Sequence, residues 1–157
     1  DRAGINALQY DMRAEMQVEY RRVAPMEGRT TVTEPQQRVA LIVDDNHYNR
    51  DLSALSLRHV GFQVVEAENG ARALEILQTR NFDLMVLDLA MPELDGVSVL
   101  RQLQALPNTK SMCVVIMTAN PHMLTDEVND QADFIMHKPI DVMEFARFAR
   151  RLTEASV

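Results

Sequence analysis

Five short apolar runs, each rich in branched or bulky residues, follow residue 38 and predict strands buried on both faces. They are Val39–Val43, Val64–Val65 with its flanks, Leu84–Leu87, Cys113–Met117 and Phe134–Met136. Between them, apolar residues recur three or four positions apart, which predicts helices. These stripes are Leu52, Leu55, His59 and Val60; Ala73, Leu74 and Leu77; Val97, Leu100 and Leu103; and Val142, Phe145, Ala146, Ala149 and Leu152. The alternation is typical of an α/β fold, a doubly wound five-stranded parallel sheet with helices on both faces.

The first 37 residues have a different pattern. Residues 1–24 carry apolar side chains at helical spacing and predict one amphipathic helix, with Ile5, Leu8, Met12, Met16, Tyr20 and Val23 on one stripe. Residues 25–37 contain two prolines and a glycine and predict a linker, so we place the domain itself at residues 38–157. A lone helix of this length is marginal in water. We expect it to end an upstream domain, to dock on the domain, or to form a homodimer.

Composition narrows the class of protein. The 16 Lys and Arg residues against 23 Asp and Glu residues give a formal net charge of −7, which weighs against nucleic acid as a partner. The single cysteine, Cys113, can form neither an internal disulfide nor a Cys-based zinc site. No apolar run approaches the ~18–20 residues of a bilayer span, and no signal peptide pattern begins the chain. We therefore expect a cytoplasmic protein without membrane contact in this segment.

Acidic residues follow two of the predicted strands. Asp44 and Asp45 come after the first strand, and Asp88 comes after the third. If these strands are neighbours in a parallel sheet, the three carboxylates share one edge and repel one another unless a cation lies among them. Oxygen ligands alone, with no histidine or cysteine, favour Mg²⁺. The alternative is that these acids only cap the helices that follow.

Two further strand ends carry complementary groups. Thr118 supplies a hydroxyl after the fourth strand, and Lys138 supplies an ammonium after the fifth. Acids, a metal ion, a hydroxyl and an ammonium together indicate a site for a phosphoryl group. Asp88 is the best candidate for a carboxylate nucleophile because it stands alone on its strand end, whereas Asp44 and Asp45 suit metal binding.

The motifs at these strand ends resemble the receiver domain of bacterial two-component response regulators over about residues 38–153. They are Val43-Asp44-Asp45-Asn46, Leu87 to Gly96, Met117-Thr118-Ala119 and Lys138-Pro139. The run from Asp44 to Arg50 also resembles receivers attached to hybrid sensor kinases. The resemblance implies a flavodoxin-like sheet of strand order 2-1-3-4-5 and a histidine kinase or histidine phosphotransfer protein as partner. The N-terminal helix, predicted from its own apolar spacing, would be an addition to this fold.

The resemblance also implies the role of each site residue. Asp88 would be the phosphoacceptor, and Mg²⁺ would be bound by Asp45, Asp88 and the backbone carbonyl of Ala90, with Asp44 acting through water. Thr118 and Lys138 would bind the phosphoryl oxygens, and the Lys138–Pro139 peptide would be cis. Asn120 and Ala90 correspond to positions that tune dephosphorylation. Because Ala90 has no side chain that activates water, we expect slow to moderate dephosphorylation.

Part of the chain departs from the family pattern. The segment between Thr118 and Lys138 is about two residues shorter than usual, so we expect the helix within Asn120–Gln131 to be short or frayed. The aromatic switch position, three residues before the lysine, holds Ile135, while Phe134 lies one residue earlier. Either the strand is shifted or Ile135 takes the switch position.

Three rival functions stay open at this point. A haloacid-dehalogenase-like phosphatase shares the metal, aspartate, threonine and lysine, but its nucleophile belongs to an Asp-x-Asp motif after the first strand. A flavodoxin-like binding module would need a phosphate-binding loop that Asn46–Asp51 does not provide. A degenerate receiver would act through protein contacts without phosphorylation. The basic residues Arg147, Arg150 and Arg151 of the last helix offer a second surface for a homodimer.

Overall fold

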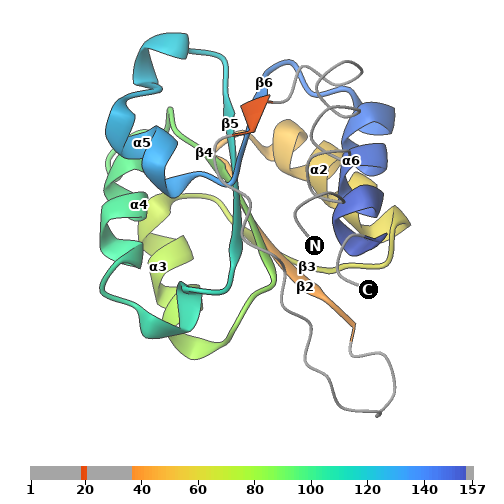
Figure 1. Ribbon diagram of the computed structural model, residues 1–157, viewed down its shortest axis with the longest axis horizontal. Coiled ribbons are helices and arrows are strands. Elements are labelled where there is room, and N and C mark those ends of the chain that lie inside the picture. The colour runs from red at the N-terminus through yellow and green to blue at the C-terminus, as the bar shows by residue number, and fades with distance from the viewer. Residues whose placement is uncertain (1–18, 21–36, 155–157) are drawn as a thin grey trace.

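The computed structural model describes residues 19–20 and 37–154, and in this part of the chain strands and helices alternate (Figure 1). The strands are β1 (Glu19–Tyr20), β2 (Val39–Val43), β3 (Gln63–Ala67), β4 (Leu84–Asp88), β5 (Cys113–Thr118) and β6 (Phe134–His137). The helices are α2 (His47–His59), α3 (Gly70–Thr79), α4 (Gly96–Leu103), α5 (Asp126–Gln131) and α6 (Val142–Glu154), with short 3₁₀ helices at Pro107–Thr109 and Pro121–Met123. Every strand predicted after residue 38 is present, within one or two residues of its predicted bounds.

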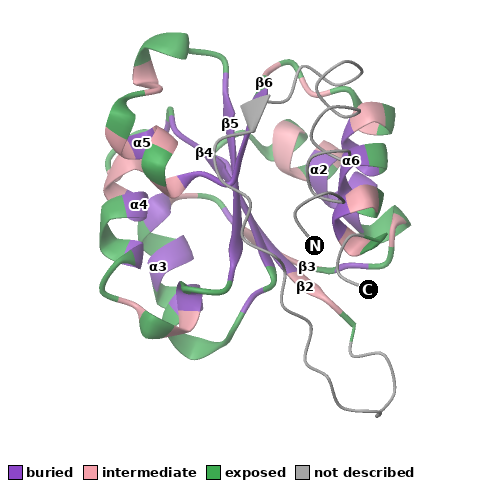
Figure 2. Ribbon diagram, viewed as in Figure 1, coloured by how far each residue is buried: buried purple, intermediate pink, exposed green. Residues whose placement is uncertain are grey.

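The strands form one sheet of order β1-β6-β5-β4-β2-β3. β2 to β6 are parallel to one another, and in their own numbering the order is 2-1-3-4-5, as the resemblance implied. Helices α2 and α6 cover one face of the sheet, and α3, α4 and α5 cover the other (Figure 1). The central strands β4 and β5 are buried along their whole length because both faces are covered (Figure 2).

β1 corrects part of the N-terminal prediction. Glu19 and Tyr20 form a strand antiparallel to β6, paired with Ile135 and Phe134, where the sequence predicted a helix. The reason is long-range: the outer edge of β6 presents free N–H and C=O groups, and pairing with them overrides a local helical pattern. The rest of the predicted helix 1–24, and the linker up to residue 36, lie outside the described residues, so the homodimer through this helix stays a prediction.

Two further differences concern burial. β3 is an edge strand, so only Ala67 is fully buried and the rest of the strand is half-buried or exposed, whereas burial on both faces was predicted. In α2 the buried face consists of Ser53, Ala54, Ser56 and Leu57. The predicted stripe was therefore wrong at Leu55, which is 60% exposed, and at His59, which is also exposed. Small residues face the sheet because α2 also packs closely on α6, where the Ser56 hydroxyl donates to the Val142 carbonyl at 3.1 Å.

The helix before β6 is short, as predicted for the segment Asn120–Gln131. α5 has six residues, capped by the Thr125 hydroxyl, and only Val128 of the helix is buried.

Across the described residues, none of the helices has both the length and the apolarity needed to cross a membrane.

Candidate functional site

The carboxylates of Asp44, Asp45 and Asp88 meet at the carboxyl edge of the sheet. β2 and β4 are adjacent parallel strands, so their ends lie side by side. Each of the three residues offers a carboxylate oxygen within 4.8 Å of the other two. Asp44 and Asp88 are 5% and 4% exposed, while Asp45 is exposed to solvent. We call this cluster the acid pocket.

Lys138 projects into the acid pocket from the end of β6. Its Nζ lies 2.8 Å from Asp44 Oδ2 and 3.3 Å from Asp88 Oδ2, and its side chain is 15% exposed. Burial alone would lower the pKa of Lys138, but the hydrogen bond and charge of Asp44, together with Asp88, raise it overall. Lys138 is therefore a firmly charged partner of both acids. The Lys138–Pro139 peptide is cis, as expected.

The buried carboxylate of Asp88 lies close to one positive charge, on Lys138, and to one negative charge, on Asp44. Burial raises the pKa of Asp88, Lys138 opposes this by lowering it, and the charge of Asp44 raises it again, so that the net pKa is raised. The backbone N–H of Ala90 donates to Asp88 Oδ1 at 3.1 Å and favours the ionised form. The pocket thus concentrates negative charge that one ammonium only partly compensates.

The backbone around Asp88 leaves no space for a larger residue at Gly96. Gly96 begins α4, and its N–H donates to the Leu89 carbonyl at 3.1 Å. A Cβ added at Gly96 would collide with the carbonyl oxygen of Asp88 and lie 2.7 Å from the Leu89 Cα. The Asp95 carboxylate caps the same helix by accepting from the Ser98 N–H at 2.8 Å. This close approach fixes the turn that carries Asp88 into α4.

Thr118 lies beside this turn at the end of β5 and is fully buried. Its hydroxyl accepts from the Asn120 N–H at 3.0 Å and donates to the Asn120 carbonyl at 3.2 Å. Its own carbonyl accepts from the Lys138 N–H at 3.0 Å. The Asn120 side chain in turn accepts from the His122 N–H at 3.1 Å. Thr118 is therefore linked both to Lys138 and to the loop that leads into α5.

The two residues considered for the switch position face opposite sides of the sheet. Phe134 packs edge-to-face on Phe148 of α6, with ring centroids 5.1 Å apart. Ile135 is fully buried on the other side, in the core shared with α3 and α4. Since Ile135 pairs with Ile116 and the β5–β6 register is regular, no local shift of the strand occurs. The position next to α5 is held by an aliphatic side chain.

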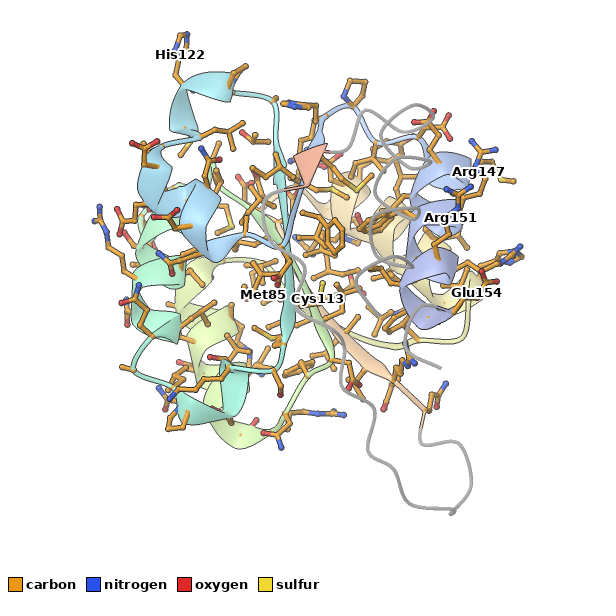
Figure 3. All side chains as sticks on the ribbon, in the orientation of Figure 1. Met85, Cys113, His122, Arg147, Arg151 and Glu154 are labelled. Atoms are coloured by element: carbon orange, nitrogen blue, oxygen red, sulfur yellow. The ribbon has the colours of Figure 1, made fainter. Side chains whose placement is uncertain are left out.

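Other predicted features lie away from the pocket. Arg147 and Arg151 project from α6 (Figure 3), where Arg147 and Arg150 are exposed and Arg151 is half-buried. A homodimer through this face stays a prediction.

Two charged residues beside the acid pocket, Arg50 and Glu66, were not predicted as part of it. Arg50 stands in the quoted Asp44–Arg50 motif, which was the one signal available.

The donor set fits a hard divalent cation. All three candidate side chains are carboxylates, two of them buried, and the exposed Asp45 leaves one side open to water. The Ala90 backbone, the fourth predicted ligand, is tied to Asp88 through its N–H. In the described residues no other group of acids, histidines or cysteines comes together in this way.

The parallel sheet, the acid pocket and the half-buried lysine at its carboxyl edge fit a signalling domain that receives a phosphoryl group. The family model "Response regulator receiver domain" matches residues 40–149, and the chain belongs to this family. It is a receiver of two-component phosphorelay signalling, and nothing in these comparisons favours a phosphatase, a flavodoxin-like module or a degenerate receiver.

Individual relatives show how far the likeness extends. The two-component response regulator ORR3 of Oryza sativa subsp. indica is 30% identical over 125 residues, 78% of this chain and 95% of that protein. Hybrid signal transduction histidine kinase E of Dictyostelium discoideum is 40% identical over 97 residues, which is 59% of this chain but 6% of the kinase. The response regulator TrrA from Thermotoga maritima, solved in complex with Mg²⁺-BeF, is 29% identical with a TM-score of 0.64, covering 73% of this chain and 98% of TrrA. The likeness is thus not confined to bacterial proteins.

Proposed function

We propose that Asp88 accepts a phosphoryl group from the phosphohistidine of a histidine kinase or a histidine phosphotransfer protein. The observation that carries this proposal is the position of Asp88, buried at the centre of the acid pocket with Lys138 Nζ 3.3 Å away. An oxygen of Asp88 attacks phosphorus, the new O–P bond forms as the P–N bond to the donor breaks, and the electron pair of that bond stays on the imidazole. The chain acts as a signalling protein whose only chemistry is its own phosphorylation and dephosphorylation.

Asp44, Asp45, Asp88 and the Ala90 carbonyl are the groups that would hold Mg²⁺. When bound, the ion neutralises charge that builds up on the phosphoryl oxygens during transfer. Lys138 contributes a second positive charge to the same oxygens. Because it already contacts both Asp44 and Asp88, it needs only to exchange one carboxylate partner for the phosphoryl group.

Thr118 is the residue that transmits the change. A phosphoryl group adds about −1.5 to −2 charges at the strand ends and offers three strong acceptor oxygens. The Thr118 hydroxyl then donates to one of them instead of to the Asn120 carbonyl. That exchange loosens the loop at Asn120 and His122, which leads into the short helix α5. The surface around α5 changes, and protein contacts change with it.

The phosphoryl group is expected to persist. Ala90 has no side chain that orients an attacking water, and the side-chain oxygen of Asn120 already accepts from the His122 N–H. Slow to moderate dephosphorylation follows.

The donor protein is expected to dock where α2 leaves the acid pocket. Tyr48 and Leu55, seven residues apart on one face of α2, are 69% and 60% exposed. Met143, in the first turn of α6, is 67% exposed, and this turn is tied to α2 through Ser56. A donor must cover the rim of the pocket to bring its histidine to Asp88, so an apolar surface beside the rim suits a helical partner with its own apolar face.

Acetyl phosphate with Mg²⁺, followed by intact mass measurement, tests the proposal. We expect one phosphoryl group on the unchanged chain, none on Asp88→Asn, and one on the control Asp51→Asn. No adduct on the unchanged chain would support a degenerate receiver, and turnover of many phosphomonoesters would support a phosphatase. A phosphorylated donor tests docking: Tyr48→Ala should slow transfer from the protein donor and leave the reaction with acetyl phosphate unchanged.

A further inference from the structure

A half-buried guanidinium beside the acid pocket, that of Arg50, has no part in the chemistry described so far. Arg50 lies in the first turn of α2, and its side chain is only 15% exposed. Its Nη1 donates to the backbone carbonyl oxygen of Asp44 at 2.9 Å. A cation withdrawn from water requires partners for its N–H groups, so the partners that it has are informative.

The other partners of Arg50 belong to two more segments of the chain. Its Nε lies 3.7 Å from Glu66 Oε1 in β3, and its Nη2 lies 3.4 Å from His47 Nδ1 at the start of α2. Glu66 is held from a second side by Arg58, at 3.5 Å. The planar fork of Arg50 therefore joins the end of β2, the edge strand β3 and the first turn of α2. Lysine, with a single ammonium group, has no equivalent geometry.

The contact with the Asp44 carbonyl has a consequence for Asp45. That carbonyl oxygen belongs to the rigid peptide plane that also contains the N and Cα atoms of Asp45. The N–H of Asp44 donates to the Ala67 carbonyl at 3.2 Å, and its side chain binds the Asn46 N–H and Lys138. With these groups fixed, the bond from Arg50 sets the orientation of the peptide plane that leads into Asp45.

Asp45 depends on its backbone for its direction. Its side chain is exposed, and within residues 37–154 its carboxylate forms no hydrogen bond or ion pair, yet it offers an oxygen within 4.8 Å of those of Asp44 and Asp88. Within residues 37–154, therefore, no side-chain contact aims it at the pocket, and its direction depends on the peptide plane that leads into it.

We infer that Arg50 is a positioning residue, which holds the Asp44–Asp45 peptide so that the Asp45 carboxylate faces Asp88 and can serve as a ligand of Mg²⁺. The inference rests on the proposed function, in which Asp45 binds the ion. Groups that orient metal ligands typically contribute 10- to 100-fold to metal affinity. Arg50 acts through Asp45 and does not touch the phosphoryl group.

The test compares Arg50→Ala with Arg58→Ala in the full chain. Both variants remove a cation that contacts Glu66, but only the first loses the bond to the Asp44 carbonyl. Calorimetric titration with Mg²⁺ should show a Kd raised about tenfold in Arg50→Ala and unchanged in Arg58→Ala. At saturating Mg²⁺ the yield of the Asp88 adduct in Arg50→Ala should return to that of the unchanged chain, which separates positioning from a general loss of folded protein.

The outcomes separate this inference from the proposed function. A folded Arg50→Ala chain that binds Mg²⁺ as tightly as the unchanged chain overturns the inference alone. An unchanged chain that takes up Mg²⁺ but forms no adduct overturns the proposed function alone, and one that takes up no Mg²⁺ overturns both. If Arg50→Ala does not fold, Arg50→Lys decides: it keeps the charge but loses the fork, so a Kd raised severalfold supports the inference and an unchanged Kd contradicts it.

Discussion

Replacing Asp88 by asparagine should stabilise the metal-free protein at neutral pH. The side chain is 4% exposed, so its negative charge is largely withdrawn from water. At an effective dielectric constant of about 20, Lys138 at 3.3 Å offers about 5 kcal/mol of attraction. Asp44, whose carboxylate lies within 4.8 Å, imposes at least about 3.5 kcal/mol of repulsion. The small remainder does not offset a desolvation cost of several kcal/mol. We expect Asp88→Asn to raise the free energy of unfolding by about 1–3 kcal/mol.

The pH dependence follows from the raised pKa of Asp88. The folded protein binds this proton more tightly than the unfolded chain, whose value is near 3.8, so stability from this group is greatest below pH 3.8 and is lost as the pH rises through the raised pKa. The advantage of Asp88→Asn should therefore be absent in acid and grow as the pH rises through the raised pKa of Asp88. Excess Mg²⁺ should reduce or reverse it, because an ion at ~100 times its Kd adds about 2.7 kcal/mol to the protein that binds it.

Urea unfolding followed by circular dichroism, in EDTA and in excess Mg²⁺, measures these differences. Asp51→Asn is the matched control, since Asp51 is exposed on α2 and, among residues 37–154, its ion pair is with His47 alone. Its stability should change little, with no dependence on Mg²⁺. A metal-free Asp88→Asn protein less stable than the unchanged chain at neutral pH would show that Lys138 fully compensates Asp88, and would refute the reasoning.

Three further predictions concern the framework of the site. Gly96→Ala should lower the free energy of unfolding by roughly 1–3 kcal/mol and reduce acetyl phosphate labelling, because the added Cβ meets the Asp88 carbonyl; unchanged labelling would contradict this. Phe148→Ala, at a fully buried position, should cost about 3–5 kcal/mol in urea unfolding while the Mg²⁺ Kd of the folded fraction stays the same. Arg101→Ala removes an exposed bidentate pair with Glu127, at 2.6 and 2.9 Å, and should shift the urea midpoint only slightly, with no effect in high salt.

The sequence predicted the parallel sheet well because its signal is local. Short apolar runs rich in β-branched residues, such as Val39–Val43, are typical of strands in a covered sheet, so they indicate strands without knowledge of their neighbours. Burial of a single residue depends on packing instead. Leu55 has the spacing of a core residue, but the close approach of α2 to α6 selects the small residues Ser53 and Ala54. β1 depends on pairing with β6, more than a hundred residues away, and no local pattern indicates that.

The acid pocket was predictable as a set of residues but not as a network. Asp44, Asp88 and Lys138 follow strands that end at one edge, which brings them together whatever the details. The distances decide that Lys138 lies closer to Asp44 than to Asp88, and that the Thr118 hydroxyl bonds Asn120. Such preferences depend on side-chain and loop geometry. The inferred role of Arg50 could not be predicted from the sequence for the same reason, because it depends on the hydrogen bond from its guanidinium to the Asp44 carbonyl.

Cys113 gives the protein a built-in reporter. It is the single cysteine of the chain, begins β5 and lies within the sheet (Figure 3), where it is 2% exposed. Burial, with a smaller effect of the Asp133 charge, raises the pKa of its thiol. Thiol reagents need an accessible thiolate, so they react only after the strand separates from its neighbours. The rate at which Cys113 is alkylated in native buffer therefore measures how often the sheet opens transiently, and no dye has to be introduced.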